Sequence, residues 1–219
     1  MKDKKNKTNS AKDSQEQSNT SFYRLGDLFD GFLDSPAIEK LLHHHPDSIG
    51  SKFYKEIQDN PNFNKLEIMS RIALDYANAN LDQLPIDISR SIVVHLRLGD
   101  VMAGYTLHER RKRPLDLEYI NSLISEYVEK TYVIGKPYFA VTSSKNYEEC
   151  YRLSNEYLQT SIQVLNAKHF DSDDADLDLC CGLKSKIFVQ GRGRYSNLIV
   201  KIRKKLKLCC IEVDSHLDI

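Results

Sequence analysis

Two short stretches of this sequence combine basic residues with glycine in the manner of anion-binding loops. The first is His95-Leu96-Arg97-Leu98-Gly99-Asp100, which follows a short β-branched apolar run. Alternation along a strand sends His95 and Arg97 to one face, and Gly99 lets the chain leave the sheet. The planar Arg97 guanidinium suits two phosphate oxygens, although a structural ion pair to Asp100 or to a helix carboxylate explains it equally well. Both interpretations stay open at this point.

The second stretch is Gln190-Gly191-Arg192-Gly193-Arg194-Tyr195-Ser196-Asn197, a basic, glycine-rich turn that leads into a helix. Glycine lets a ligand approach the backbone, and the first N–H groups of a helix, together with its dipole, attract anions. The spacing matches neither the phosphate loop with its lysine nor the dinucleotide-binding glycine pattern. An anion site and an ordinary strand-to-helix turn with solvated arginines are both compatible with it.

Acidic residues and cysteines make weaker cases for metal chemistry. The run from Asp171 to Asp178 contains D-x-D triplets, which can hold a divalent metal against a diphosphate. Acidic residues also favour the first turn of a helix, and we expect that role for most of them. The five cysteines are odd in number and lack zinc-ligand spacing, so we expect reduced, buried thiols and no bound metal.

The hydrophobic pattern predicts the elements that position these stretches. Residues 1–20 are almost wholly polar, which predicts a disordered tail, and apolar residues at helical spacing predict several short helices over 21–89. From residue 90 onward, short apolar runs alternate with helical patterns. We expect strands at 92–94, 138–141, 162–165, 187–189 and 209–213, and helices at 115–132, 147–158, 175–183 and 197–206.

Five strands separated by four helices predict an α/β fold with a Rossmann-like parallel sheet over residues 90–219. Such sheets bind ligands beyond the carboxyl ends of their strands, and both basic stretches follow a predicted strand. We therefore expect the two stretches at the same edge of the sheet. The loop with Arg110-Arg111-Lys112-Arg113 belongs to this edge as well, where it either reinforces an anion site or forms a solvated face.

Composition narrows the classes of function and location. Lys and Arg number 31 and balance 31 Asp and Glu, so no overall charge points to DNA or to an anionic membrane as a partner. No apolar run approaches the roughly 20 residues that span a bilayer, and the polar N-terminus does not resemble a signal peptide. We therefore expect a soluble, cytoplasmic protein with one main domain.

The first basic stretch resembles the H-x-R-x-G-D motif of the fucosyltransferase superfamily, which includes the α1,2- and α1,6-fucosyltransferases and the protein O-fucosyltransferases. The segment from Asp178 to Val189, followed by Tyr195-Ser196, is similar to a later motif of that family. In that motif an Asp opens a helix, a strand follows, and an aromatic-Ser pair begins the next helix. The resemblance covers about residues 90–210.

The resemblance implies an inverting, metal-independent enzyme whose GT-B C-terminal lobe binds GDP-fucose as donor substrate and needs no cofactor. It implies that Arg97 binds the diphosphate and stabilises the departing GDP, that Asp178 contacts the nucleoside, and that Ser196 holds phosphate. His95 and Asp100 would shape the first loop. The full set of expected donor-binding residues is His95, Arg97, Gly99, Asp100, Asp178, Gly193, Arg194, Tyr195 and Ser196, with Arg97 catalytic.

Two features depart from the family pattern. Many members carry a second Arg where this chain has Leu98, and Arg194 is a candidate to replace it. A complete GT-B enzyme also needs two Rossmann-like lobes, and residues 21–89 are too few and too helical for one. We therefore expect a glycan or protein acceptor to bind a reduced acceptor side or one supplied by a partner chain. The alternative is a non-catalytic, nucleotide- or glycan-binding half-transferase.

Overall fold

The computed structural model describes residues 25–99, 102, 114–138 and 147–213. A sheet of five parallel strands forms its centre, with strand order β5-β3-β1-β6-β7. The strands are β1 (Ile92–His95), β3 (Thr131–Ile134), β5 (Ala167–His169), β6 (Ile187–Val189) and β7 (Cys210–Ile211). The predicted α/β fold with a five-stranded, Rossmann-like parallel sheet is therefore confirmed. A separate pair, β2 (Leu98–Gly99) and β4 (Pro137–Tyr138), continues the chain beyond β1 and β3.

The strand order places a switch point between β1 and β6. The chain builds outward from β1 to β3 and β5, then returns through a helix to β6 on the other side of β1. In parallel α/β sheets the loops that leave the two strands of a switch point diverge to opposite faces, and ligands bind in the crevice expected between them at the carboxyl edge. Both predicted anion-binding stretches are these two loops.

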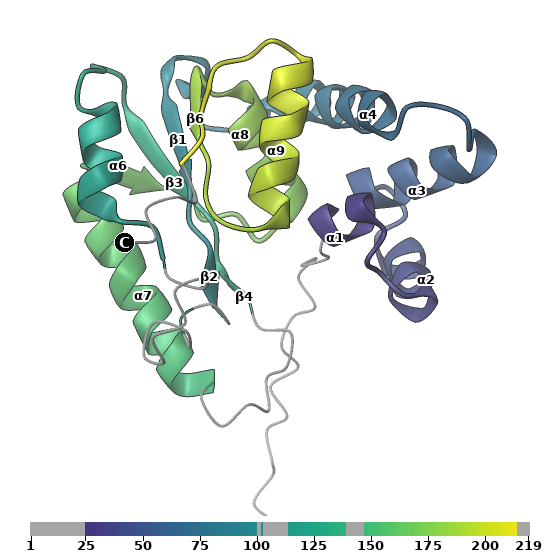
Figure 1. Cartoon of the computed structure of the whole chain (residues 1–219), viewed down its shortest axis with the longest axis horizontal. Coiled ribbons are helices and arrows are strands. Elements are labelled where there is room, and N and C mark those ends of the chain that lie inside the picture. Colours follow the sequence, from purple (N-terminus) through teal and green to yellow (C-terminus); the bar gives the residue numbers. More distant parts are fainter. Residues whose placement is uncertain (1–24, 100–101, 103–113, 139–146, 214–219) are drawn as a thin grey trace, which may run out of the picture.

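Helices cover both faces of the sheet (Figure 1). The helices α6 (Leu117–Ile124) and α7 (Tyr147–Val164) pack on one face, where their apolar side chains share a core with Ile92 and Val94. The opposite face, which includes Val93, packs against α8 (Ala175–Lys184) and α9 (Arg194–Lys205). Strand alternation sorts the side chains of β1 between these two cores.

Four further helices lie on the outer side of α8 and α9 (Figure 1). Their buried side chains, such as Phe53 and Met69, belong to the same apolar core as α8 and α9. Side chains that accept hydrogen bonds from the first turn begin three of them, as the N-caps Asp34, Ser48 and Asn64. The four helices are α1 (Leu25–Asp30), α2 (Ser35–His44), α3 (Ile49–Asp59) and α4 (Lys65–Ala79). Short 3-10 turns at Leu81–Gln83 and Ile88–Arg90 lead into β1.

Two predicted strands were wrong in position. The second strand of the sheet is Thr131–Ile134, which overlaps the end of the predicted helix 115–132. Of the predicted strand 138–141 the structure describes one residue, Tyr138, which ends β4. The predicted strand 162–165 is instead the last turn of α7 and the residue after it; β5 begins after Asn166, whose φ of 45° ends the helical path. Short apolar runs fit a buried strand and a buried helical turn equally well, which explains both errors.

Arg203 on α9 joins the elements that carry the crevice. It is fully buried, and its guanidinium donates to the carbonyl groups of Gly182 at 2.5 Å, Ser185 at 3.1 Å and Cys209 at 2.9 Å. Burial lowers the pKa of Arg203 to about 10. The side chain thereby satisfies the carbonyl end of α8 and fixes it to α9 and to the start of β7.

Replacing Arg203 with methionine should lower the free energy of unfolding by about 3 kcal/mol, because the carbonyl groups it serves stay buried without donors. Urea denaturation followed by circular dichroism measures this loss. Arg152→Met is the control, since Arg152 is exposed in a pair with Glu156 and its loss should change stability by less than about 0.5 kcal/mol. Equal stability of the two variants would contradict the role given to Arg203.

Candidate active site at the carboxyl edge

The loops after β1 and β6 touch each other at the switch point. A Cβ added to Gly191 would lie 2.3 Å from both the Nδ1 atom and the carbonyl oxygen of His95. Two residues further along, a Cβ on Gly193 would lie 3.1 Å from Nη1 of Arg97. The structure therefore brings together the two stretches that the sequence separates by about ninety residues.

His95 is the buried residue at this contact between the two loops. Its side chain is buried, at 7% exposure, and its ring lies 5.4 Å from the ring of Tyr195 on α9. Burial, and next the charge of Arg97, lower the pKa of His95 to about 4. The Nδ1 atom is buried without a hydrogen-bond partner among the described residues. Burial therefore favours a neutral imidazole for His95, and its predicted role in shaping a donor-binding loop stays a prediction.

Arg97, two residues after His95, is exposed. Within the described part of the chain, no ion pair or hydrogen bond involves its guanidinium. Gly193 lies next to this guanidinium. No described carboxylate therefore forms the structural ion pair that was the alternative to phosphate binding. Its other proposed partner, Asp100, lies outside the described residues, as do Arg110-Arg111-Lys112-Arg113.

The turn after β6 is braced from within. The buried Ser196 Oγ accepts a hydrogen bond from the N–H of Gly191 at 2.7 Å, and Gly193 adopts φ of 102° as the residue that begins α9. No side chain caps this helix. An uncapped helix start beside an arginine attracts anions. The hydroxyl oxygen of Ser196 serves the loop in this structure, and its predicted contact with phosphate stays a prediction.

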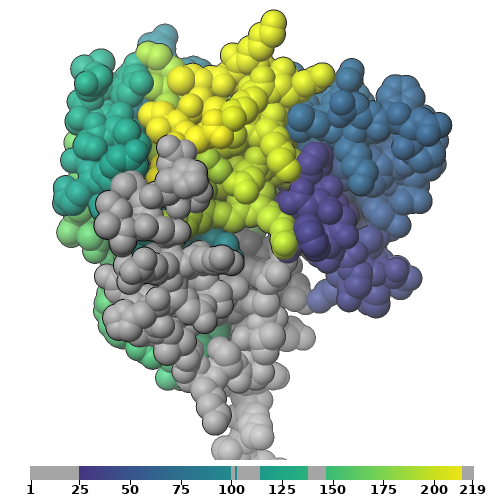
Figure 2. Space-filling view, viewed as in Figure 1, coloured from purple at the N-terminus to yellow at the C-terminus, as the bar shows by residue number. Residues whose placement is uncertain are grey.

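Arg194 and Tyr195 point to neighbouring helices. Arg194 pairs with Asp27 of α1 at 2.8 Å and lies over the ring of Phe32, 3.8 Å from its centroid. Figure 2 shows α1, in purple, in contact with α9. The hydroxyl of Tyr195 donates to the carbonyl of Ala175 at the start of α8. The structure therefore places Arg194 away from Arg97, and its predicted replacement of a second arginine stays a prediction.

Gly99 lies on the far side of its loop from the crevice. It adopts φ of 87°, which matches its predicted role in releasing the chain, and its N–H donates to Ser154 of α7 at 2.9 Å. The N–H of Gly99 therefore fixes the first loop to α7. Its predicted contact with a donor substrate stays a prediction.

Asp178 lies buried in the first turn of α8, with 4% exposure, and its Oδ1 has no hydrogen-bond partner among the described residues. Burial raises the pKa of Asp178 well above its usual value, while the charge of Lys136 acts to lower it. A buried carboxyl oxygen without a donor is costly in a folded protein, which makes Oδ1 of Asp178 a candidate contact for a ligand or an ordered water. Asp174, and not Asp178, is the side chain that caps α8.

Lys136 is a site residue that the sequence analysis missed. It directly follows β3, and its ammonium group pairs with Asp171 at 2.8 Å and with Asp173, both of which follow β5. The predicted strand 138–141 placed Lys136 before a strand, and thus at the opposite edge. The correct strand, which ends at Ile134 and is followed by Gly135, would have placed it at the crevice.

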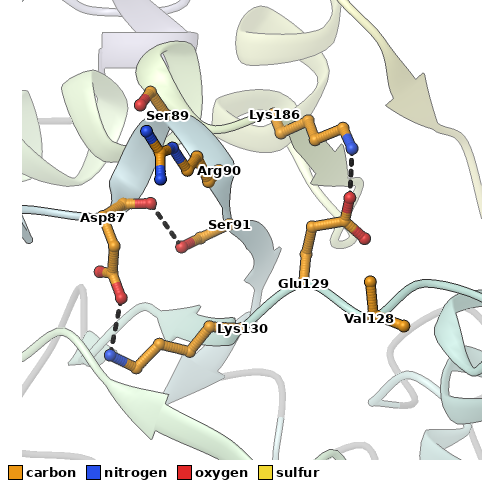
Figure 3. A pocket seen from close by; sticks show the side chains of 8 residues that line it. All are labelled: Asp87, Ser89, Arg90, Ser91, Val128, Glu129, Lys130 and Lys186. Carbon is orange, nitrogen blue, oxygen red and sulfur yellow. Dashed lines mark hydrogen bonds and ion pairs between the residues drawn. The ribbon is translucent and has the colours of Figure 1, made fainter.

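Other clefts on the molecule lack these residues. Figure 3 shows one of about 630 Å³ at the amino ends of the strands, where Lys130 pairs with Asp87 and Lys186 pairs with Glu129. A larger cleft, of about 1050 Å³, lies between α3, α4 and the start of α8. Neither contains His95, Arg97 or Gly193, and parallel sheets bind ligands at the carboxyl edge. The crevice is therefore the better candidate.

Comparison with protein-family models, with curated proteins and with solved structures finds no match for this chain. Within the described ranges, no helix is both long enough and apolar enough to cross a membrane. The same residues contain no group of three or more His, Cys, Asp and Glu side chains arranged to hold a metal ion.

Replacing Gly191 with alanine should destabilise the fold by roughly 1–3 kcal/mol, because the new methyl group meets the backbone of His95. Urea denaturation measures the effect. Gly31→Ala is a useful control, because nothing lies within 4 Å of the added Cβ and the expected cost, about 1 kcal/mol, comes from the φ of 80° alone. A Gly191→Ala variant as stable as the wild type would show that the loops have room to separate.

Acid should destabilise the fold through His95. The pKa of His95 is about 4 in the folded protein and 6.5 for an unperturbed histidine, which represents the unfolded chain. Between these pH values the unfolded chain therefore binds a proton that the folded chain does not. Stability should therefore fall by roughly 3 kcal/mol as the pH drops from 6.5 to 4, and this term should be constant above 6.5.

The measurement compares the unfolding free energy of the wild type and His95→Gln from pH 4 to 7. Asp178 contributes a slope of the opposite sign, because its raised pKa makes the folded state bind the extra proton. Asp178 is present in both proteins, so the difference between them isolates His95. Parallel pH profiles would rule out a neutral, buried imidazole.

Proposed function

We propose that this chain binds a nucleoside-diphosphate sugar in the crevice between the β1 and β6 loops and acts as a glycosyltransferase. The preferred donor is a GDP-sugar, with fucose favoured by the resemblance of the His95–Asp100 stretch to the fucosyltransferase motif. The reaction is inverting and uses no metal ion. A hydroxyl group of a glycan or protein is the acceptor.

The main observation in support is the exposed Arg97 guanidinium beside Gly193 at the uncapped start of α9. A diphosphate placed between them meets the positive charge of Arg97 on one side and the positive end of a helix dipole on the other. Both come from the two strands that flank the switch point, the usual place for a nucleotide in such a sheet.

This geometry suits departure of a nucleoside diphosphate. The bond between the sugar anomeric carbon and the β-phosphate oxygen breaks, and its electron pair stays on that oxygen. The acceptor hydroxyl oxygen bonds to the anomeric carbon from the opposite side, and its proton passes to a general base or to water. Negative charge thus grows on the β-phosphate in the transition state. Arg97 stabilises that charge more strongly than it stabilises the bound donor, which is how a fixed cation raises the rate.

Asp178 favours guanine as the base. Its unpaired Oδ1 requires a hydrogen-bond donor, and guanine carries an exocyclic amine next to a ring N–H. The accepting form is the carboxylate, yet burial raises the pKa of Asp178 and favours the neutral acid in the free protein. Binding of guanine therefore releases a proton, and affinity for GDP rises with pH over the range in which Asp178 ionises.

Arg97→Ala should weaken GDP binding by about ten- to a hundredfold, because it removes charge-assisted hydrogen bonds to the diphosphate. Isothermal titration calorimetry measures the affinity. Arg90→Ala is the matched control, since Arg90 is an equally exposed arginine at the amino edge of the sheet (Figure 3). Undiminished binding by Arg97→Ala would refute its role, and failure of the wild type to bind any nucleoside diphosphate would refute the proposed function.

Asp178→Asn should discriminate among bases. The variant keeps the shape of the side chain but loses its charge, so GDP affinity should fall about tenfold and lose its pH dependence, while UDP affinity should not change. Titrations with GDP and UDP from pH 6 to 8 measure both effects. A GDP affinity that falls with rising pH in the wild type would contradict the assignment of Asp178.

One observation favours a non-catalytic binding module as the second candidate. The described residues contain one five-stranded sheet, and their N-terminal helices share a core with α8 and α9 without forming a second nucleotide-binding lobe. Such a module would bind GDP as tightly as an enzyme would. Release of free sugar or transfer of sugar from a GDP-sugar by the purified chain, abolished in Arg97→Ala, decides for the enzyme.

A further inference from the structure

Lys136 lies level with Arg97 in the crevice. The parallel register pairs His95 with Ile134 and Leu98 with Pro137, so the two intervening residues of each segment run side by side. The two segments approach each other closely at Gly135, because a Cβ added there would lie 2.2 Å from the carbonyl oxygen of Leu96. Lys136 is thus a second cation at the carboxyl edge, one strand away from Arg97.

The ammonium group of Lys136 occupies a position between two carboxylates. Asp171 accepts a contact of 2.8 Å from Nζ and Asp173 pairs with the same atom, and the three residues come from the ends of the neighbouring strands β3 and β5. The Lys136 side chain is only 20% exposed, whereas both aspartates are mostly exposed. An Asp-x-Asp turn with oxygen ligands around one cation is the arrangement that otherwise holds Mg²⁺ or Mn²⁺.

We propose that Lys136 is the resident cation of the crevice, taking the place of a divalent metal at the Asp171–Asp173 turn and positioning the donor diphosphate next to Arg97. This inference rests on the proposed function for the donor and on the described contacts for the turn. An ammonium group has three N–H donors, and the two aspartates use two of them. The third is available to a ligand oxygen.

Lys136 influences the ionisation of the carboxyl groups around it. The hydrogen bond from Lys136 lowers the pKa of Asp171, so the carboxylate is charged and paired at neutral pH. The charge of Lys136 also acts on the buried Asp178, where it opposes the effect of burial. The charge of Lys136 therefore acts both on the turn after β5 and on Asp178, the residue that we propose contacts the guanine base.

Removing the ammonium group should expose a metal site. In the absence of nucleotide, Lys136→Ala should bind Mn²⁺ at least tenfold more tightly than the wild type, because Asp171 and Asp173 are left as unpaired oxygen ligands. Calorimetry with Mn²⁺ measures this affinity. The double variant Lys136→Ala with Asp173→Asn should lose it again, which locates the ion at the turn. Equal Mn²⁺ binding by the wild type and Lys136→Ala would overturn the proposal.

Nucleotide binding tests the link to the donor. In chelator, Lys136→Ala should bind GDP about tenfold more weakly than the wild type, Mn²⁺ should restore the affinity, and Lys136→Arg should retain it. Lys186→Ala is the control, because Lys186 pairs with the single carboxylate of Glu129 at the opposite edge (Figure 3) and should change neither affinity.

The GDP titration and the Mn²⁺ titration test separate parts of the proposal. GDP affinity that is unchanged in Lys136→Ala, or that Mn²⁺ does not restore, would overturn the positioning role. If the wild type binds no nucleoside diphosphate at all, the proposed function fails, and the Mn²⁺ titration still decides whether Lys136 stands in for a metal at the Asp171–Asp173 turn.

Discussion

Gly191 rests directly on the last residue of β1, with no space for a methyl group between its Cα and the ring or carbonyl of His95. This close approach holds the β6 turn against the β1 loop and brings Gly193 within reach of the Arg97 guanidinium. Ser196 supports it from below by accepting the Gly191 N–H. Without this contact, a basic strand end and a basic helix start would be two separate surface features instead of one crevice.

The basic side chains around the crevice have different roles. Burial keeps the His95 imidazole unprotonated at neutral pH, so at the end of β1 the positive charge is on Arg97 and not on His95. Arg194, the other arginine at the start of α9, is paired with Asp27 and secures α1 instead. After the next strand, Lys136 pairs with both carboxylates of the Asp171–Asp173 turn and offsets part of their negative charge.

The sequence predicted the sheet and both basic loops because β-branched apolar runs and glycine-rich turns are local signals. It placed β3 seven residues too late because Thr131–Ile134 continues the apolar pattern of the helix before it. That shift concealed Lys136. The orientation of Arg194 was not predictable either, since its partner Asp27 is 167 residues away in the chain. Contacts between distant segments, such as Gly191 with His95, follow from strand order, which pattern alone does not determine.

Hydrogen exchange of the backbone amides, measured by mass spectrometry with and without GDP, tests the central claim most directly. If the diphosphate binds at the switch point, GDP should slow exchange in peptides that cover residues 95–99 and 190–196, and leave residues 86–91 and 128–130 at the amino edge unchanged. Unchanged exchange in both loops at a GDP concentration that saturates binding, or protection confined to the amino edge, would contradict the account.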